Sequence, residues 1–173
     1  MSLAASEPET AAPGWQRDIW RLLATVRDPE IPVLSITDLG IVRYVRGASE
    51  DCVRVGLTPT YSGCPATDVI RKSVEQALAC AGFAHAVVET VLAPAWTSDW
   101  LTSAARAKLC AYGIAPPVKA ISNPKRLFSA ALVACPRCRS EDTRRVSEFG
   151  STPCKAHYQC CACLEPFDYF KCI

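Results

Sequence analysis

The spacing of apolar residues predicts alternating helices and strands over the first two-thirds of the chain. Apolar residues recur at the spacing of amphipathic helices over 15–26, 69–81 and 98–112. Runs rich in β-branched residues, typical of strands, occupy 41–46, 52–58 and 86–92. The last run is apolar at nearly every position, which favours a strand covered on both faces. We therefore expect an α+β domain over residues 14–115, with a small mixed sheet and packed helices.

The composition changes on either side of this domain. Residues 1–13 mix Ala, Ser, Glu, Thr and Pro without periodicity, which is typical of a disordered tail. Residues 116–126 contain three prolines and are expected to form an extended, Pro-rich linker. The second unit then occupies residues 127–173.

The cysteines are distributed unevenly between these two units. Four of the eleven are scattered over the first two-thirds of the chain, and seven lie in the last forty residues. An odd number argues against a closed set of disulfides, and clustered cysteines in a reducing compartment are typical of metal ligands or reactive thiols. The two units should therefore be stabilised by different chemistry.

Two C-x2-C motifs define the chemistry of the second unit. They pair Cys135 with Cys138 and Cys160 with Cys163, with 21 residues between them. Four thiolates from two such turns can close a tetrahedral shell around one Zn²⁺. A unit of this size cannot build a sufficient core alone, whereas structural zinc supplies about 10–16 kcal/mol in small fingers. The spacing predicts a C-terminal zinc ribbon with one Zn²⁺ per chain.

Three cysteines fall outside this pattern. Cys161 could compete with Cys160 for the metal, but only Cys160 has the x2 spacing to Cys163. Cys154 and His157 are an alternative ligand pair, although His157 is more simply interpreted as an exposed strand residue. Cys154 and Cys172 are either packed structural thiols or a second thiol pair.

In the first unit, the loop after the strand 52–58 carries the candidate functional thiol. Cys64 is followed by Pro65, which is favoured at the first position of a helix. The sulfur is therefore expected at a helix N-terminus, where partial positive charge stabilises a thiolate. The alternative is a strand-to-helix turn with a buried cysteine.

Two carboxylates flank Pro29 on the connection after the first helix. Asp28 and Glu30 could form an acid–base pair or contribute metal ligands. Side chains two residues apart on an extended segment point to opposite sides, which disfavours a shared proton. We favour a structural interpretation, in which Asp28 ends the first helix and Glu30 binds nearby backbone amides.

Several function classes find no support in the sequence. The net charge of +2 and the lack of a basic stripe argue against nucleic-acid binding. The N-terminal residues resemble no secretory signal, and the longest mostly apolar run, 127–134, is too short to span a bilayer. We expect a cytoplasmic protein without membrane contact. Phosphate-binding loops and hydrolase, zinc-protease and di-iron motifs are also missing, so the chain is not expected to be a self-contained enzyme.

Several motifs carry a resemblance to known families. Three resemble the small domain of iron–sulfur assembly factors: Asp28-Pro29-Glu30-Ile31-Pro32, Asp38-Leu39-Gly40-Ile41-Val42 and Thr58-Pro59-Thr60-Tyr61-Ser62-Gly63-Cys64-Pro65. Four later motifs resemble the PaaD (PaaJ) family: Ala95-Trp96-Thr97-Ser98-Asp99-Trp100, Tyr112-Gly113-Ile114-Ala115-Pro116-Pro117, Glu148-Phe149-Gly150-Ser151-Thr152-Pro153-Cys154-Lys155 and Pro166-Phe167-Asp168-Tyr169-Phe170-Lys171-Cys172-Ile173. Together the resemblance covers residues 15–173.

The resemblance implies an accessory protein of the phenylacetyl-CoA 1,2-epoxidase system of aerobic phenylacetate degradation. Its partners would be a di-iron oxygenase subunit, a reductase carrying flavin and an iron–sulfur cluster, and general iron–sulfur assembly proteins. Cys64 would be the thiolate for transient contact with iron or a cluster, with Asp28, Glu30 and Thr60 as candidates to support it. The family has cysteines at the positions of the two C-x2-C motifs, Cys154 and Cys172, whereas Cys161 departs from its pattern.

Three hypotheses follow for the function. The first is a maturation factor that helps to assemble the metal centres of the epoxidase. The second is a stoichiometric, non-catalytic subunit of the oxygenase complex. The third, with least support, is a zinc ribbon that binds nucleic acid.

Overall fold

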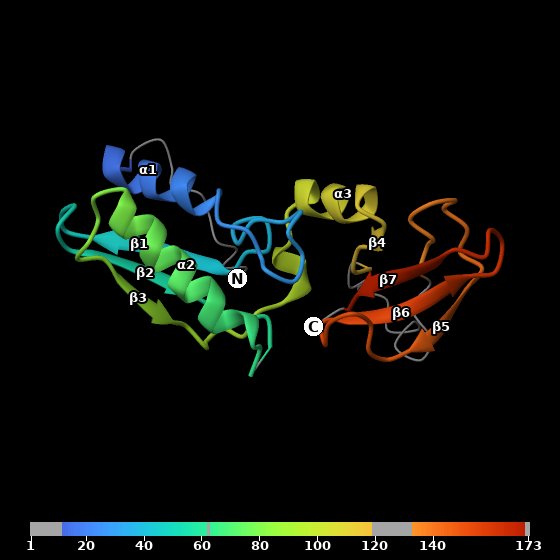
Figure 1. Cartoon of the computed structure of the whole chain (residues 1–173). Coiled ribbons are helices and arrows are strands. Elements are labelled where there is room, and N and C mark those ends of the chain that lie inside the picture. The colour runs from blue at the N-terminus through green and yellow to red at the C-terminus, as the bar shows by residue number, and fades with distance from the viewer. Residues whose placement is uncertain (1–11, 62, 119–132, 172–173) are drawn as a thin grey trace. The chain divides into compact units, whose positions relative to one another are not determined.

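Two compact units make up the chain, Met1–Thr102 and Ser103–Ile173. The computed structural model describes residues 12–61, 63–118 and 133–171 (Figure 1). Most of the expected tail over 1–13 and linker over 116–126 lies outside the described residues, as does Cys172.

The first unit is a three-stranded mixed sheet with two α-helices. Its elements are α1 (Gly14–Leu23), β1 (Val42–Gly47), β2 (Val53–Leu57), α2 (Ala66–Cys80), β3 (Val87–Thr90) and the 3-10 helix η1 (Ser98–Trp100). The strand order is β1-β2-β3, with β1 antiparallel to β2 and β2 parallel to β3. The parallel pair requires a crossover, and α2 supplies it (Figure 1). This agrees with the expected α+β class.

Apolar periodicity explains how the helices and strands of this unit pack. The inward positions of β2 are Val53, Val55 and Leu57, and all three are buried. Ile70, Val74 and Leu78 follow one face of α2 and are also buried. Full burial of such side chains stabilises the fold by about 1.5–3 kcal/mol each. The helix α1 contacts both α2 and β1, and α2 contacts β3.

Two of the motifs in this unit pack against each other. Trp96 is buried, and its Nε1 donates a hydrogen bond to the carbonyl of Leu39 (2.8 Å). Gly40 has a φ of +67°, and a Cβ there would lie only 2.9 Å from the Cβ of Trp100. The Asp38-Leu39-Gly40 turn therefore needs a glycine, because both its backbone conformation and the neighbouring tryptophan exclude a side chain.

The third strand differs from the expectation that it is covered on both faces. It spans four residues at the edge of the sheet, and Val87 is 50% exposed. The apolar run was long enough for a buried strand, but strand order is decided by pairing between distant residues. That prediction was wrong.

The predicted helix over 98–112 is interrupted. The 3-10 helix η1 ends before Leu101, whose φ of −61° and ψ of 129° are those of extended backbone, and α3 (Ser103–Ala111) then begins. The oxygen of Thr97 caps η1 by accepting a hydrogen bond from the N–H of Asp99 (3.4 Å). The boundary between the two units falls at this interruption.

The second unit combines α3 with a four-stranded sheet. The strands are β4 (Ile114–Ala115), β5 (Thr143–Ser147), β6 (Lys155–Cys160) and β7 (Pro166–Phe170), in the order β4-β7-β6-β5. Because β4 pairs in parallel with β7, α3 and β4 belong to this unit, whereas the sequence placed the end of the first domain at residue 115. The antiparallel strands β5, β6 and β7 form the ribbon itself.

A small core lies on one face of the second sheet. Its members are buried and come from β4, β6, β7 and the segment 133–135: Ala115, Val133, Cys135, Ala156, Cys160, Phe167 and Tyr169. Tyr158 packs against this cluster, with its ring stacked on Phe167 and edge-on to Tyr169. Two cysteines are therefore part of the core, which ties the packing of the unit to their chemistry.

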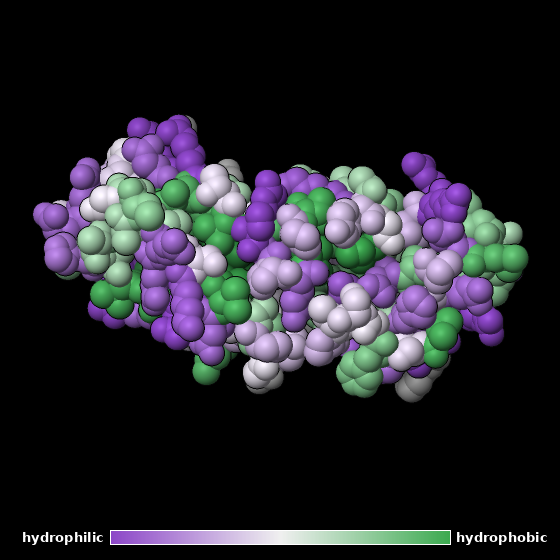
Figure 2. All heavy atoms as spheres, in the orientation of Figure 1, coloured by the Kyte–Doolittle hydropathy of each residue, from purple (hydrophilic) through white to green (hydrophobic). Residues whose placement is uncertain are grey.

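The surface is mixed in character. On the face seen in Figure 2, hydrophobic and hydrophilic residues are interspersed over both units. Among the residues that the structure describes, the exposed large apolar side chains are spread along the chain: Val69, Val87, Leu92, Tyr112, Val146, Phe149 and Leu164. Among the helices of the described residues, none has the length and apolar character needed to cross a membrane.

Candidate metal centre and the Cys64 loop

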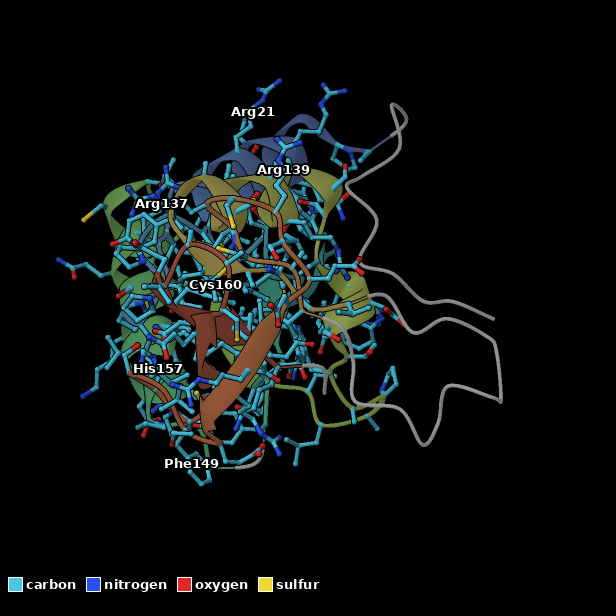
Figure 3. The ribbon with its side chains drawn as sticks, turned by 90° about the vertical axis from the view of Figure 1, so that its right-hand side faces the viewer. Arg21, Arg137, Arg139, Phe149, His157 and Cys160 are labelled. Atoms are coloured by element: carbon cyan, nitrogen blue, oxygen red, sulfur yellow. The ribbon has the colours of Figure 1, made fainter. Side chains whose placement is uncertain are left out.

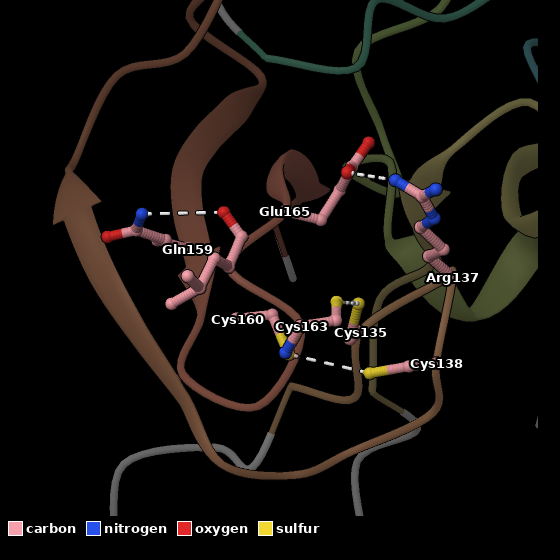
Figure 4. A network of polar contacts seen from close by, with 8 residues as sticks. Cys135, Arg137, Cys138, Gln159, Cys160, Cys163 and Glu165 are labelled. Atoms are coloured by element: carbon pink, nitrogen blue, oxygen red, sulfur yellow. Dashed lines mark hydrogen bonds and ion pairs between the residues drawn. The ribbon is translucent and has the colours of Figure 1, made fainter.

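Both C-x2-C motifs meet at one end of the ribbon. Cys135 and Cys138 lie on the turn that precedes β5, Cys160 ends β6, and Cys163 lies on the turn into β7. The four sulfur atoms all lie within 4.8 Å of one another (Figure 4). The structure thus brings together the four residues that their spacing singled out.

The distances between the sulfurs fit a tetrahedral metal site. The Sγ atoms of Cys138 and Cys160 are 3.5 Å apart, and those of Cys135 and Cys163 are 3.8 Å apart. A tetrahedron with metal–sulfur bonds of about 2.3 Å has edges of about 3.8 Å. The group can therefore hold one metal ion with little movement of its side chains.

The same backbone turn is used in each cysteine pair. The N–H of Cys135 donates to the carbonyl of Ser140 (2.9 Å), and the N–H of Cys160 donates to the carbonyl of Glu165 (2.9 Å). The residue after each second cysteine has a positive φ, 64° at Arg139 and 63° at Leu164. Neither residue is glycine, so both turns hold a side chain in a conformation that is normally avoided.

The thiols of this group differ in acidity. The pKa of Cys160 is lowered to about 7, mainly because the N–H of Cys163 donates a hydrogen bond to its sulfur. The backbone of Glu165 acts to lower the pKa of Cys163, but removal from water and the three neighbouring thiols outweigh it and raise that pKa to about 12. Four sulfurs at this distance cannot all ionise without a cation, which is the condition that a bound metal satisfies.

The site has a buried side and an exposed side. Cys135 and Cys160 are almost completely buried in the core, whereas Cys138 and Cys163 are exposed. A metal held here would lie at the edge of the unit, with two of its ligands accessible from solvent.

The other cysteines of the second unit lie apart from the four sulfurs. Cys161 is exposed, and its N–H donates to the carbonyl of Asp142 (2.8 Å). Cys154 is buried near the opposite end of β6, with its sulfur 3.1 Å from the hydroxyl of Thr152. His157 lies along β6, and its Nδ1 is 3.5 Å from Asp168. In the part of the chain that the structure describes, the metal-ligating group includes none of these three.

A network around Asp168 was not predicted from the sequence. Its carboxylate accepts a hydrogen bond from Ser151 (2.8 Å) and lies 3.7 Å from the ammonium group of Lys155, a side chain only 6% exposed. A Cβ at Gly150 would approach Asp168 to 2.7 Å. The network fixes the loop before β6, and Figure 3 shows Phe149 of that loop at the end of the unit away from Cys160. The signal for this network in the sequence was Lys155, a charged residue in a strand, β6, whose other residues are buried or half-buried.

Another residue that sequence reasoning missed lies beside the first cysteine turn. Cys110 of α3 is half-buried, with its sulfur 4.0 Å from the carbonyl of Pro136. We expected α3 in the first domain, so the contact between Cys110 and this turn of the second unit was not predicted.

In the first unit, Cys64 lies directly before α2. Pro65 has a φ of −65° and a ψ of −24° and lies directly before the first helical residue, Ala66, whereas it was expected at the first helical position itself. The turn is closed by hydrogen bonds from the N–H of Cys64 to Tyr61 (3.2 Å) and from Thr67 to the carbonyl of Cys64 (3.2 Å). The Cys64 side chain is half-buried. Gly63 has a φ of +84°, which explains the need for glycine at that position.

Near Pro29, Asp28 takes the amide-binding role that was expected of Glu30. The buried Asp28 accepts hydrogen bonds from the N–H groups of Glu30 (2.9 Å) and Ile31 (2.7 Å). The helix α1 ends earlier, at Leu23, so Asp28 fixes a turn instead of ending a helix. Glu30 is half-buried in the same turn, and Thr60 is half-buried in the loop that leads to Cys64.

The two parts of the chain match two family models. Residues 16–91 match an iron–sulfur cluster assembly protein family, and residues 120–171 match the PaaD zinc beta ribbon domain. A crystal structure of a domain of unknown function, DUF59, from Bacillus anthracis is similar to 55% of this chain and 91% of its own, with 25% identity and a TM-score of 0.51.

Two relatives extend this result. A protein of Porphyromonas gingivalis named "Fe-S protein maturation auxiliary factor" is 34% identical over 95 residues, 54% of this chain and 90% of its own length. An Escherichia coli (strain K12) protein, named as a subunit of 1,2-phenylacetyl-CoA epoxidase, is 51% identical over 164 residues, 95% of this chain and 97% of its own length. Since this last similarity spans nearly all of both proteins, the chain belongs to the PaaD family of phenylacetyl-CoA epoxidase subunits.

Proposed function

We propose that the chain is an accessory maturation factor for a phenylacetyl-CoA epoxidase and helps to assemble its iron or iron–sulfur centres. The observation that carries the proposal is the union of two parts in one chain. An iron–sulfur assembly domain presents Cys64 before a helix, and a four-cysteine ribbon follows it. The alignment with the Porphyromonas relative, which is named as a maturation factor, spans 95 residues, about as many as the first unit contains.

In this proposal Cys64 makes transient contact with iron or a cluster, which is cargo and not a resident cofactor. The half-buried Cys64 side chain lies just before α2, at the N-terminal end of that helix. A thiolate is the form that binds soft metals and clusters. Asp28, Glu30 and Thr60 would act indirectly, by holding the turn and the loop of the same unit.

The ribbon is proposed to hold one zinc ion through Cys135, Cys138, Cys160 and Cys163. A tetrahedral set of four sulfurs suits zinc or iron, and closed sites of this kind are typical of structural zinc. Zinc would supply the free energy that the small core lacks, and the folded ribbon would provide contact with the client. Elemental analysis of the full-length protein should give about one zinc per chain.

The proposal is tested in cells that produce the epoxidase together with this chain carrying Cys64→Ser. We expect the chain to fold and keep its zinc, while the purified epoxidase subunits are short of iron. Cys80→Ser is the matched control, because Cys80 is exposed at the other end of α2. Epoxidase that is fully loaded with iron in the Cys64→Ser cells would refute the role of Cys64.

A stoichiometric, non-catalytic subunit is the second candidate function. It is favoured by the name of the Escherichia coli relative, which calls that protein a subunit. A complex with the other epoxidase subunits that survives gel filtration at equal stoichiometry would support this function. Transient maturation predicts that the chain separates from the loaded epoxidase.

A further inference from the structure

An ion pair joins the two cysteine turns across the metal-ligating group. Arg137 lies between Cys135 and Cys138, and Glu165 lies two residues after Cys163. The Nη1 of Arg137 pairs with the Oε2 of Glu165, as Figure 4 shows beside the four cysteines. The contact therefore links two segments that are 28 positions apart and that supply two ligands each.

The second turn is fastened to the sheet independently of this ion pair. The N–H of Cys160 donates to the carbonyl of Glu165 (2.9 Å) and closes the turn. The amide of Gln159 donates to the carbonyl of Leu164 (3.4 Å), and Arg144 of β5 donates to Gln159 (2.6 Å). Glu165 thus projects from an anchored backbone.

The first turn is closed by the equivalent hydrogen bond and carries one exposed ligand. Cys135 is buried and its N–H donates to the carbonyl of Ser140 (2.9 Å), but Cys138 is exposed. Arg137 is the neighbour of this exposed ligand in the chain. Opening the site from the solvent side would move Arg137 away from Glu165.

We propose that the Arg137–Glu165 ion pair is a latch that holds the two turns closed and limits the rate at which the bound metal leaves. Both are positioning residues, since neither contributes a ligand atom. A metal with four ligands is lost stepwise, and the exposed ligands Cys138 and Cys163 are the first that solvent or a chelator can reach. This inference rests on the proposed zinc occupancy of the ribbon.

A second explanation involves only the charge of each residue. It predicts the opposite effect of Glu165→Gln on the rate of zinc loss. Four thiolates around a divalent cation carry a net charge of about −2. Arg137 would then stabilise the site and Glu165 would weaken it, so Glu165→Gln would slow the loss of zinc. The latch predicts that Glu165→Gln accelerates it, because the partner of Arg137 is lost.

The experiment measures zinc release from the full-length, zinc-loaded protein to an excess of a chromogenic chelator. We expect Arg137→Gln and Glu165→Gln each to raise the release rate about two- to fivefold, the range for an exposed ion pair. The double variant should release zinc no faster than the faster single variant. Exchanging the charges, with Arg137→Glu and Glu165→Arg together, should restore much of the slow release.

Arg145→Gln is the matched control. Arg145 pairs with Glu148 at 2.6 Å in the same unit, and these side chains are 56% and 53% exposed, against 69% and 39% for the latch. Its release rate should equal that of the unmodified chain. Circular dichroism of each zinc-loaded variant verifies that the unit is folded before release begins.

Two results would overturn the latch. One is release at the unmodified rate from both single variants, and the other is slower release from Glu165→Gln. A full-length chain that binds no zinc would instead refute the proposed zinc site, and with it the basis of the latch. The experiment therefore distinguishes a failure of the latch from a failure of the proposed zinc site.

Discussion

Leu164 and Arg139 hold the two cysteine turns in a left-handed backbone conformation, with φ values of 63° and 64°. This conformation costs a non-glycine residue roughly 1–2 kcal/mol. Only the spacing of the cysteines hints at it in the sequence, because nothing in Leu or Arg favours a positive φ. The conformation is imposed by bringing four sulfurs to one point.

Replacing Leu164 tests this backbone assignment. Leu164 is 69% exposed, so Leu164→Gly loses little burial and should stabilise the zinc-loaded protein by about 0.5–1 kcal/mol. Leu164→Val should destabilise it by about 1 kcal/mol, because a β-branched side chain tolerates a positive φ least. Chemical denaturation followed by circular dichroism gives both values. Leu92→Gly, at equal exposure but without a positive φ, should bring no gain.

Gly150 is required by contact instead of by backbone angle. The Cβ of an alanine there would lie 2.7 Å from Asp168 and 3.3 Å from Lys155. Gly150→Ala should therefore destabilise the second unit by about 1–3 kcal/mol, the cost of overpacking. Thermal unfolding measures the change. Gly14→Ala is the control, since no atom beyond its own helix backbone and chain neighbours lies within 4 Å of the added Cβ, and an equal loss in both variants would contradict the assignment.

At the scale of elements, the edge strand β3 is tied to its neighbours by polar side chains. Glu89 accepts a hydrogen bond from the hydroxyl of Tyr44 on β1 and pairs with Arg54 on β2 at 2.6 Å. The ring of Tyr44 lies over Gly56, where a Cβ would meet it at 2.6 Å. The strand thus depends on cross-strand pairs as well as apolar burial.

These contacts give the first unit a defined dependence on pH. The pKa of Glu89 lies below its ordinary value of 4.5. The main cause is the hydrogen bond from Arg54, and the second is the hydrogen bond from Tyr44. A carboxyl whose pKa is lowered by folding stabilises the native state above its unfolded pKa, and this contribution is lost as pH falls through the lowered value. Glu89→Gln should therefore be less stable than the unmodified chain at pH 7 and equally stable in strong acid. Unfolding experiments across this pH range test it, and a difference that persists in acid would contradict the assignment.

The elements also show where sequence periodicity was sufficient. The helix α2 and strands β1 and β2 were predicted well because their apolar faces repeat along the chain itself. The interruption at Leu101 was missed because a helical pattern continues on both sides of it. The exposure of β3 was missed because it depends on strand order, which local spacing does not contain.

At the scale of the whole molecule, the two units rely on different sources of stability. The first has a core shared by two helices and a sheet, and the second has a small core that includes two of its four candidate ligands. The four-cysteine group was predictable, since x2 spacing is a local property. The membership of α3 and β4 in the second unit was not predictable, because it is decided by the pairing of β4 with the distant β7.

This division predicts that metal removal acts on one unit alone. All four tryptophans, Trp15, Trp20, Trp96 and Trp100, lie in the first unit. A chelator should remove ribbon structure, seen by circular dichroism, and leave the unfolding transition detected by tryptophan fluorescence unchanged. Readdition of zinc should restore the ribbon. A matching loss in both signals would show that the units do not fold separately.

Loading of a metal-depleted epoxidase with iron in a defined mixture tests the proposed role of Cys64 directly. The epoxidase subunits are incubated with ferrous iron and the full-length chain, with either Cys64 or Cys64→Ser, and the iron bound per subunit is measured over time. The unmodified chain should load iron faster than the mixture without it, and Cys64→Ser should load no faster than that mixture. Equal loading by the two forms of the chain would contradict a role for Cys64 in iron transfer.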